Sequence, residues 1–259
     1  MTKYGICEQS IVPVRKLPSN QSEMVNQLIF GDLVTILDMK DSWCLIITKH
    51  DLYEGWVDIK QIMILEQLQF NEIARSMPFF TSNIYSYAST KSGKTKHLLL
   101  GSRLPKYNQN SFLISGEKYI FKGNIQTKPS KIIGNDIVNI AIKYIGSPYL
   151  WGGRSPFGID CSGFTQMVFS MVGIKLKRDA SLQVEKGEVI DFITESVAGD
   201  LAFFDNSEEK ITHVGIILNN KKIIHASGEV RIDNLDHQGI YNEELKKYTH
   251  KLRIIKRIS

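Results

Sequence analysis

Three side chains in the C-terminal half of the sequence could form a nucleophile with its base. Cys161 lies in the sequence DCSG at residues 160–163, and His213 and His225 follow it in two apolar segments. A thiol becomes a strong nucleophile when an imidazole takes its proton, and a further polar group can hold that imidazole in the required tautomer. A lone cysteine more often simply packs in a core, so the surroundings of Cys161 decide between the two interpretations.

The residues after Cys161 predict a helix that carries the thiol at its N-terminus. Gly173 supplies a stop for this helix. Apolar side chains recur before it with the spacing of one helix face: Phe164, Met167, Val168, Met171 and Val172. Unpaired N–H groups and the helix dipole favour a thiolate at this position. We therefore expect a depressed pKa for the Cys161 thiol and stoichiometric inactivation by iodoacetamide.

The two histidines are predicted to face each other across a β-hairpin. Residues 213–218 (HVGIIL) and 222–227 (KIIHAS) are apolar, and residues 219–221 (NNK) supply the turn. A turn centred on residue 219 places His213 directly opposite His225, with their Cβ atoms about 5 Å apart. Isolated histidines are more often structural or solvated. A cross-strand pair combined with a cysteine at a helix N-terminus is a more specific pattern.

The segments DCSGF, HVGI and IIHAS, in this order, resemble the NlpC-type cell-wall cysteine peptidases, which have a papain-like fold. The resemblance extends from about Ile132 to the C-terminus. It implies that Cys161 is the nucleophile, His213 the general base and His225 the third, orienting residue. Tyr149 matches a tyrosine that in this family helps to stabilise the oxyanion near the nucleophile.

The N-terminal part resembles a second type of domain. Short strands with turn signals between them predict a small barrel in residues 1–66. Its segments SEMV, LIFG and YEGWV resemble the bacterial SH3-like domains of one family branch, the γ-D-glutamyl-L-diamino acid endopeptidases (dipeptidyl-peptidase VI). Residues 67–130 are predicted by analogy to be a second SH3-like β domain. We expect an α+β fold in which two small barrels precede a papain-like domain in residues 131–259.

The resemblance also implies a set of substrate-binding residues. In this branch a carboxylate and a tyrosine of the first barrel close the cleft around the N-terminus of the substrate, and Glu23 and Tyr53 match them. The sequence RDAS at residues 178–181 resembles an element of the amine pocket, although some relatives carry Ser in place of Ala180. The full expected set is Glu23, Tyr53, Trp151, Asp160, Ser162, Asp179 and Ser181. The structural alternatives are a surface charge for Glu23, a barrel-core aromatic for Tyr53 and a helix N-cap for Asp179.

The activity implied by the resemblance is hydrolysis of the bond between γ-D-Glu and the diamino acid in peptidoglycan stem peptides with a free N-terminal L-Ala. The product would be L-Ala-D-Glu, and no cofactor or metal is expected. Two alternatives stay open: a non-catalytic protein that binds peptidoglycan fragments, and an amidase or acyltransferase on the same Cys-His-His frame. The presence of all three catalytic side chains weighs against the first. The choice of diaminopimelate or Lys at the third stem position stays open.

Composition and charge exclude several other classes. The chain has 259 residues, 42% hydrophobic and 23% charged, as in an ordinary globular protein. A net charge of +5 without a Lys/Arg-rich run gives no sign of nucleic-acid binding. The three cysteines lack metal spacing and are odd in number, which argues against a disulfide framework. The final residues, KLRIIKRIS, predict an edge strand. Asp233, Asp236 and His237 are assigned to a polar loop.

The absence of long apolar segments bears on the cellular location of the protein. No stretch approaches 18 consecutive apolar residues, and the first residues, MTKYGICEQS, have no apolar signal region. We therefore expect a cytoplasmic monomer without a membrane span, although a removed leader and a periplasmic location stay open.

Overall fold

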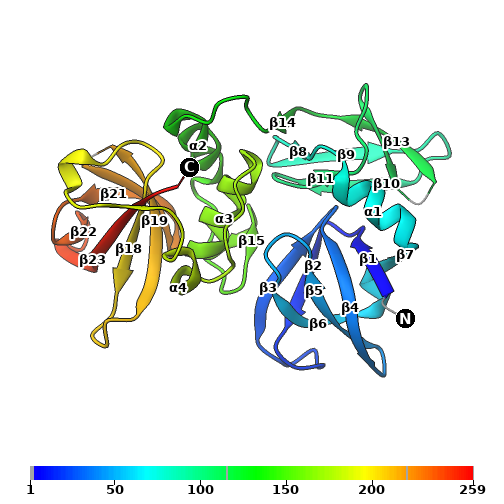
Figure 1. Ribbon diagram of the computed structural model, residues 1–259, viewed down its shortest axis with the longest axis horizontal. Coiled ribbons are helices and arrows are strands. Elements are labelled where there is room, and N and C mark those ends of the chain that lie inside the picture. The colour runs from blue at the N-terminus through cyan, green and yellow to red at the C-terminus, as the bar shows by residue number, and fades with distance from the viewer. Residues whose placement is uncertain (1–2, 115, 220, 259) are drawn as a thin grey trace. The chain divides into compact units, whose positions relative to one another are not determined.

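The computed structural model describes residues 3–114, 116–219 and 221–258 (Figure 1). The chain divides into two compact units, of which the first comprises Met1–Lys128 and Trp151–Pro156 and the second Pro129–Leu150 and Phe157–Ser259. The chain therefore leaves the second unit for six residues just before the helix of Cys161. The division into three domains at residues 66 and 130 stays a prediction. Among the described residues, no helix is long and apolar enough to cross a membrane.

The first unit opens with a sheet of seven antiparallel strands, in the order β3-β2-β6-β5-β4-β1-β7. Alternation of apolar and polar residues explains these strands, because every second side chain of β2 and β5 is buried. Val12, Val14 and Ile46 are fully buried in the shared core. The strands are β1 (Lys3–Cys7), β2 (Ile11–Arg15), β3 (Met24–Ile29), β4 (Leu33–Lys40), β5 (Trp43–Thr48), β6 (Glu54–Asp58) and β7 (Ile62–Leu65), with a short 3-10 helix, η1 (Ile59–Gln61), before β7.

The rest of the first unit contains a helix and two smaller sheets, ordered β10-β9-β13-β12 and β11-β8-β14. Phe30 of the first part packs in one apolar cluster with Leu98 and Phe112 of this part, so the two parts share a core. The identification of this part as a second SH3-like barrel stays a prediction. The elements are α1 (Gln67–Arg75), β8 (Phe79–Thr81), β9 (Tyr85–Ser89), β10 (Thr95–Leu99), β11 (Arg103–Leu104), β12 (Ser111–Ile114), β13 (Glu117–Lys122) and β14 (Ile125–Thr127).

The second unit places helices against an antiparallel sheet of seven strands, in the order β17-β23-β18-β19-β20-β21-β22. β23 also pairs with β22, so the sheet closes on itself. The helices are α2 (Gly134–Ala141), η2 (Ile142–Tyr144), α3 (Cys161–Met171), α4 (Ala180–Gln183) and η3 (Ile193–Glu195). The strands are β16 (Gly158–Ile159), β17 (Glu188–Ile190), β18 (Leu201–Asp205), β19 (Ile211–Asn219), β20 (Lys222–Ser227), β21 (Glu229–Leu235), β22 (Gly239–Asn242) and β23 (Lys247–Arg257).

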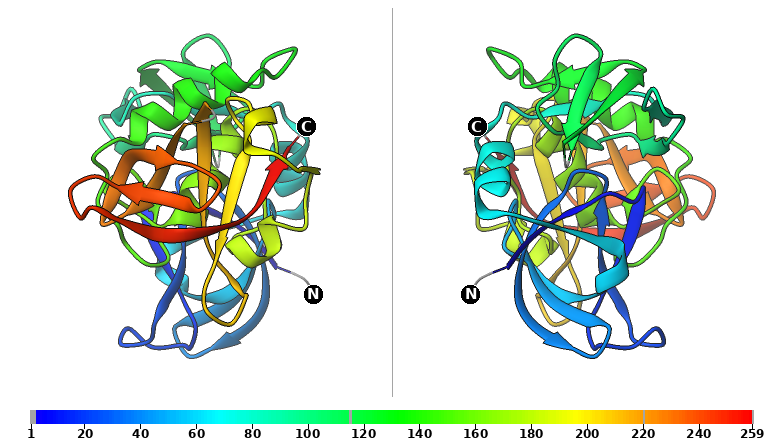
Figure 2. Two further views of the ribbon diagram at one scale, coloured as in Figure 1. Left: turned by 90° about the vertical axis from the view of Figure 1, so that its left-hand side faces the viewer. Right: turned by 90° about the vertical axis from the view of Figure 1, so that its right-hand side faces the viewer.

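The last strand corrects one expectation. β23, the long red strand in Figure 2, pairs with both β17 and β18 and is therefore not an edge strand. Cationic side chains can occupy a strand inside the sheet because exposed and less exposed side chains alternate along β23. The closed sheet encloses an apolar cluster that includes Phe204, Ile217, Ile223 and Ile240. Closure around this cluster brings β19, β20 and β23 together, although β23 lies far from the other two in the sequence.

The segment Trp151–Pro156 is bound to the first unit by a buried ion pair. Arg154, on the short strand β15 (Arg154–Ser155), donates to the Asp32 carboxylate and to the Gln27 carbonyl, each at 2.7 Å. Gly152 lies against β3 with φ of +78°, and a Cβ at this position would lie 2.6 Å from the Met24 carbonyl oxygen. The glycine and the arginine together fix the path of this segment.

We predict that Arg154→Ala destabilises the first unit by about 3–5 kcal/mol, because it leaves the Asp32 carboxylate without its buried partner. All three tryptophans, Trp43, Trp56 and Trp151, belong to this unit, so urea unfolding followed by tryptophan fluorescence reports its stability. Glu72→Ala removes an exposed ion pair with Lys106 and is the matched control, with an expected change within about 0.5 kcal/mol. Equal effects of the two variants would contradict the assignment.

Candidate active site

Cys161 is the first residue of α3, as the sequence predicts. Asp160 caps the helix, since its carboxylate accepts a hydrogen bond of 2.7 Å from the Gly163 backbone N–H. The helix ends at Met171, and Gly173 follows with φ of +87°. The helix is buried nearly all round, which differs from the single apolar face expected. Such burial leaves Cys161 little freedom to move.

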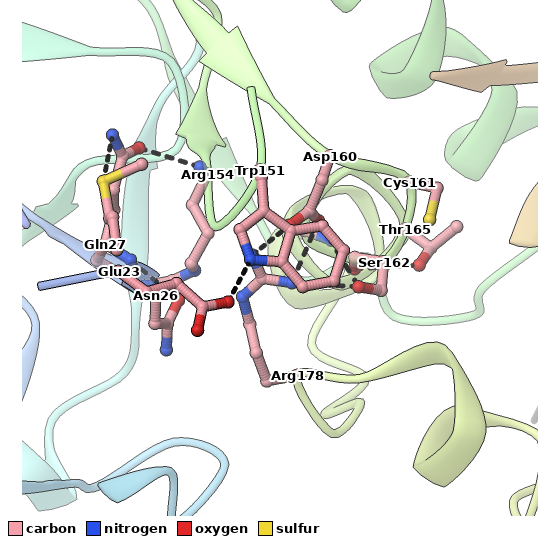
Figure 3. Close-up of polar contacts among 12 residues, drawn as sticks. Glu23, Asn26, Gln27, Trp151, Arg154, Asp160, Cys161, Ser162, Thr165 and Arg178 are labelled. Atoms are coloured by element: carbon pink, nitrogen blue, oxygen red, sulfur yellow. Dashed lines mark hydrogen bonds and ion pairs between the residues drawn. The ribbon is translucent and has the colours of Figure 1, made fainter. Parts of the chain in front are cut away.

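A buried ion pair holds the N-terminus of α3 (Figure 3). The Arg178 guanidinium pairs with the Asp160 carboxylate and also donates to the Ser162 hydroxyl at 2.9 Å. Gln183 of α4 donates to the Ser162 carbonyl at 2.9 Å. Asp160 and Ser162, both expected to bind substrate, therefore have a structural function in fixing the turn that carries Cys161.

The pKa of the Cys161 thiol is raised to about 12, first by burial and then by the charge of Asp160. The backbone N–H groups of Val214 and Ser162 and the Arg178 guanidinium act in the opposite direction without outweighing burial. The expected depression of this pKa is therefore wrong, because desolvation outweighs the helix N-terminus here. The resting site holds a neutral thiol, which needs a base to take its proton.

The thiol lies beside the strand that carries the first histidine. Cys161 Sγ is 4.0 Å from the Thr212 carbonyl oxygen, and its thiolate form would also interact with the Val214 N–H. These two backbone groups flank His213 on β19. The structure therefore brings the cysteine to the strand position of His213, as the proposed pairing of nucleophile and base requires.

The two histidines are hydrogen-bonded, but their strand register differs from the prediction. His225 is paired with Gly215, and the ladder shifts between Ile217 and Asn219. Asn219 pairs with Lys222, so the turn is not centred on residue 219. His213 therefore takes a diagonal position relative to His225, on the same face of the sheet. The expected turn includes Asn220, which lies outside the described residues. His213 Nε2 and His225 Nδ1 are still 2.8 Å apart.

A carboxylate continues this chain of hydrogen bonds. His225 Nε2 lies 3.0 Å from Asp233 Oδ2, and Arg231 donates to both oxygens of that carboxylate at 2.8 and 3.1 Å. Burial alone would raise the pKa of Asp233, but the bonds from His225 and Arg231 hold it below its ordinary value. Asp233 is therefore an anion that accepts a hydrogen bond from the N–H of His225 Nε2.

This anion determines the tautomers of both histidines. With its proton on Nε2, His225 keeps a lone pair on Nδ1, so His213 Nε2 must be the donor in the bond between the rings. His213 then keeps its own lone pair on Nδ1, which is available to a thiol. Burial lowers the pKa of His213 well below its ordinary value, and the imidazoles of His225 and His250 add to this effect. The imidazole is therefore neutral, as a base must be.

The other residues expected at the site fall into two groups. In the second unit, Tyr149 is 38% exposed, and burial raises its pKa to about 12, so its hydroxyl stays protonated. Asp179 occupies the N-cap position of α4 without capping it through its side chain, and Ser181 is exposed on that helix.

In the first unit, Trp151 is 60% exposed, and its Nε1 donates to Glu23 Oε1 at 2.9 Å (Figure 3). Lys16 Nζ lies 3.5 Å from the other oxygen of Glu23. Tyr53 lies just before β6, where its backbone N–H donates to the Thr48 hydroxyl at 2.9 Å. The structure therefore joins Glu23 and Trp151 directly. Their functions in binding, and that of Tyr53, stay predictions.

Family comparisons agree with this geometry. Residues 146–250 match the NlpC/P60 family, and residues 14–62 match the bacterial dipeptidyl-peptidase Sh3 domain. The chain carries an NlpC/P60 domain. It also carries an N-terminal SH3-like domain, so the α+β fold with this order of domains is confirmed. An NlpC/P60 domain with a buried cysteine beside a histidine pair supports a cysteine peptidase.

Individual relatives resemble this chain over most of their own length. It is 27% identical to the γ-D-glutamyl-L-lysine dipeptidyl-peptidase of Bacillus cereus, with 80% of this chain and 68% of that protein aligned. It is also 27% identical to dipeptidyl-peptidase 6 of Lysinibacillus sphaericus, over 88% of this chain and 90% of the relative. The crystal structure of an NlpC/P60 family protein from Bacillus cereus has a TM-score of 0.81 over 98% of this chain and 99% of that one. Its identity of 19% shows the fold alone.

Two residues of the NlpC/P60 site were missed by the sequence analysis. Asp233 was assigned to a polar loop, but it lies on β21 and contacts His225. Arg231 is the cross-strand partner of His225, and Asp233 lies two residues beyond it on the same face. A correct prediction of the β20–β21 register would therefore have placed Asp233 near His225. His250 on β23 stacks on His213, with ring centroids 4.1 Å apart. No local signal marks His250, because its approach depends on closure of the sheet.

We predict that iodoacetamide alkylates Cys161 slowly at neutral pH and about tenfold faster per pH unit up to at least pH 10, because the thiolate fraction rises towards a pKa of about 12. Mass spectrometry of the modified peptide between pH 6 and 10 gives the rates. Cys161→Ala is the control, since it leaves only the buried thiols of Cys7 and Cys44. A rate that reaches its plateau below pH 7 would show a stable thiolate and contradict the account.

A second prediction concerns the relay. His213→Ala should lose nearly as much peptidase activity as Cys161→Ala, because nucleophile and base act as a unit. His225→Ala should lose on the order of 10²–10⁴-fold in kcat/KM, by analogy with other orienting groups. His225→Gln can still accept from His213 and donate to Asp233, so it should keep at least about ten times the activity of His225→Ala. The orienting function is wrong if Gln is no better than Ala.

Proposed function

We propose that this protein is a cysteine peptidase that hydrolyses the bond between γ-D-Glu and the diamino acid of peptidoglycan stem peptides with a free N-terminal L-Ala, releasing L-Ala-D-Glu. The observation that carries the reaction class is the hydrogen-bonded chain from Asp233 through His225 to His213, beside the Cys161 thiol. The named dipeptidyl-peptidases among its relatives support the substrate. A role in recycling or degrading murein peptides follows from that substrate.

The proposed reaction begins when Cys161 Sγ attacks the γ-carbonyl carbon while His213 Nδ1 takes the thiol proton. The imidazolium that forms on His213 is stabilised through His225 by the Asp233 carboxylate. His213 then passes the proton to the leaving amine of the diamino acid, and a thioester remains on Cys161. A water molecule that gives a proton to His213 hydrolyses the thioester, which frees the thiol and the product carboxylate.

The developing oxyanion has donors in the second unit. Backbone N–H groups in the first turn of α3 have no partner within the helix and lie next to Cys161. The Tyr149 hydroxyl keeps its proton because its pKa is raised to about 12, first by burial and then by the thiolate form of Cys161 and the charge of Asp160. We propose that Tyr149 donates to this oxygen.

The substrate and the alternatives are tested by mass spectrometry of products from L-Ala-γ-D-Glu-L-Lys and from the diaminopimelate analogue. We expect free L-Ala-D-Glu and the diamino acid, with Cys161→Ala as the inactive control. A second reaction with an added amine distinguishes hydrolysis from transfer, since a transferase gives a product whose mass includes the amine. Binding without cleavage would contradict the peptidase proposal. Light scattering and cell fractionation test the expected monomer and cytoplasmic location.

We further propose that Glu23 selects the free N-terminus. A free α-amine is cationic near neutral pH, and a charge-assisted hydrogen bond to a carboxylate would favour it over a blocked terminus. Glu23 is already held in place by Trp151 Nε1, although Lys16 competes for its charge. Tyr53, Asp179 and Ser181 are proposed to complete the binding of the dipeptide.

The prediction for Glu23 separates its charge from its contact with Trp151. Glu23→Gln keeps an acceptor for the Trp151 N–H but removes the charge, so KM for the free peptide should rise about 10- to 100-fold with little change in kcat. Glu23→Ala loses both and should be at least as impaired. Kinetics with free and N-acetylated stem peptide are compared for all three proteins. An unchanged preference for the free peptide in Glu23→Gln would exclude this role.

A further inference from the structure

A cluster of three imidazoles surrounds the proposed base. One ring nitrogen from each of His213, His225 and His250 lies within 4.8 Å of the others. The rings of His213 and His250 are stacked, with an angle of 25° between their planes, and the His225 ring lies nearly perpendicular to both. The proposed peptide hydrolysis uses His213 and His225 but leaves His250 without a function.

We propose that these three histidines form a reversible inhibitory site for Zn²⁺. Imidazole nitrogens are common zinc ligands, and three of them with one open position are sufficient for a tetrahedral ion. The binding itself depends only on the cluster, whereas its inhibitory effect rests on the proposed peptidase function.

Two of the three lone pairs are already directed by hydrogen bonds. Asp233 keeps the proton of His225 on Nε2, so Nδ1 has a lone pair that can coordinate once His213 no longer donates to it, as in the carboxylate–histidine–zinc arrangement. His250 Nδ1 lies 2.9 Å from the Thr249 hydroxyl, which donates in turn to the Ile240 carbonyl at 3.4 Å. His250 Nδ1 is therefore the donor to Thr249, and its Nε2 carries the lone pair.

The third ligand explains why the ion would inhibit. His213 donates from Nε2 in the resting relay, so coordination through Nε2 requires its proton to move to Nδ1. The same number of protons remains on the ring, but Nδ1 can then no longer take the proton of the Cys161 thiol. Zinc binding and the catalytic tautomer of His213 therefore exclude each other.

The geometry requires only small movements. Zinc–nitrogen bonds of about 2.0–2.1 Å in a tetrahedral site place the nitrogens about 3.4 Å apart. The distance between His213 Nε2 and His225 Nδ1 is 2.8 Å and must widen, whereas the largest separation in the cluster, within 4.8 Å, must shorten. Rotations of the imidazole rings can supply shifts of this size.

A groove of about 820 Å³ gives the ion a path to the cluster. It is lined by His250 and Thr212, together with the acidic residues Asp205 and Glu209. Both Asp205 carboxylate oxygens are buried without a hydrogen bond from the described residues, and Arg253 Nε is 3.8 Å from one of them. Lys251 also lines the groove. Arg253 Nη2 lies 3.9 Å from Glu209 Oε2, so this arginine pairs with both carboxylates and the groove serves the ion as an open path rather than as an acidic one. His250 is the cluster member that reaches this groove.

Zinc affinity is measured first, on the Cys161→Ala protein, so that the thiol cannot act as a ligand. Competition with a chromophoric chelator gives Kd for Zn²⁺ alone. His250→Asn and His250→Gln, each in the same background, should weaken binding at least about tenfold, because an outer-shell change alone costs that much in zinc sites. His97→Asn removes an exposed imidazole that contacts Tyr85 and is the matched control. Equal affinity in all four proteins, or no zinc binding at all, overturns the proposal.

Inhibition is measured on the protein with its thiol intact. Zn²⁺ should inhibit stem-peptide cleavage, EDTA should restore it, and each His250 variant should need at least about tenfold more zinc for half-inhibition relative to its own metal-free rate. Zinc binding without inhibition would overturn the tautomer argument. Failure of the metal-free protein to cleave any stem peptide would overturn the proposed function, while the affinity measurements would still decide the zinc site.

Discussion

The chemistry of this protein depends on the direction of one buried hydrogen bond, between His213 Nε2 and His225 Nδ1. If His213 is the donor, its Nδ1 can take a thiol proton, and if it is the acceptor, Nδ1 carries a proton and cannot. Asp233 decides the direction because its carboxylate requires the proton of His225 on Nε2. Arg231 keeps that carboxylate ionised and in place. The state of the base is thus set through three groups, His225, Asp233 and Arg231, of which the part-exposed arginine lies farthest from it.

The closed sheet of the second unit supplies the frame for this relay. His213 is paired with Phe204, and Ile240 with His250, so both histidines share the inner face with residues of the apolar cluster. Gly215 makes the diagonal approach of the two rings possible, because a Cβ there would lie 2.9 Å from the Cβ of His225. The burial that excludes water also keeps both the thiol and the imidazole neutral. Charge therefore develops only as the thiol attacks.

Local patterns in the sequence were sufficient to predict the helix that begins at Cys161 and the contact between His213 and His225. The helix begins and ends where its cap and its glycine indicate, because both signals act within a few residues. The predicted register of the hairpin was wrong because Asn219 pairs with Lys222, so the turn is not centred on residue 219, and alternation alone does not fix the centre of a turn. The predicted direction of the Cys161 pKa shift was also wrong. Burial raises this pKa, and whether a helix N-terminus is buried depends on how the whole domain packs. Asp233 and His250 depend on strand order and closure, which no motif of this chain specifies.

The most direct test of the account is the tautomeric state of His213 and His225. Two-bond ¹H–¹⁵N correlation spectra of the Cys161→Ala protein, labelled at histidine and free of metal, report which ring nitrogen carries the proton. We predict that the His213 ring is neutral at pH 7, that His213 and His225 each carry a proton on Nε2, and that Asp233→Asn disturbs the His225 signals first. A proton on Nδ1 of His213, or an imidazolium at His213, would contradict the relay.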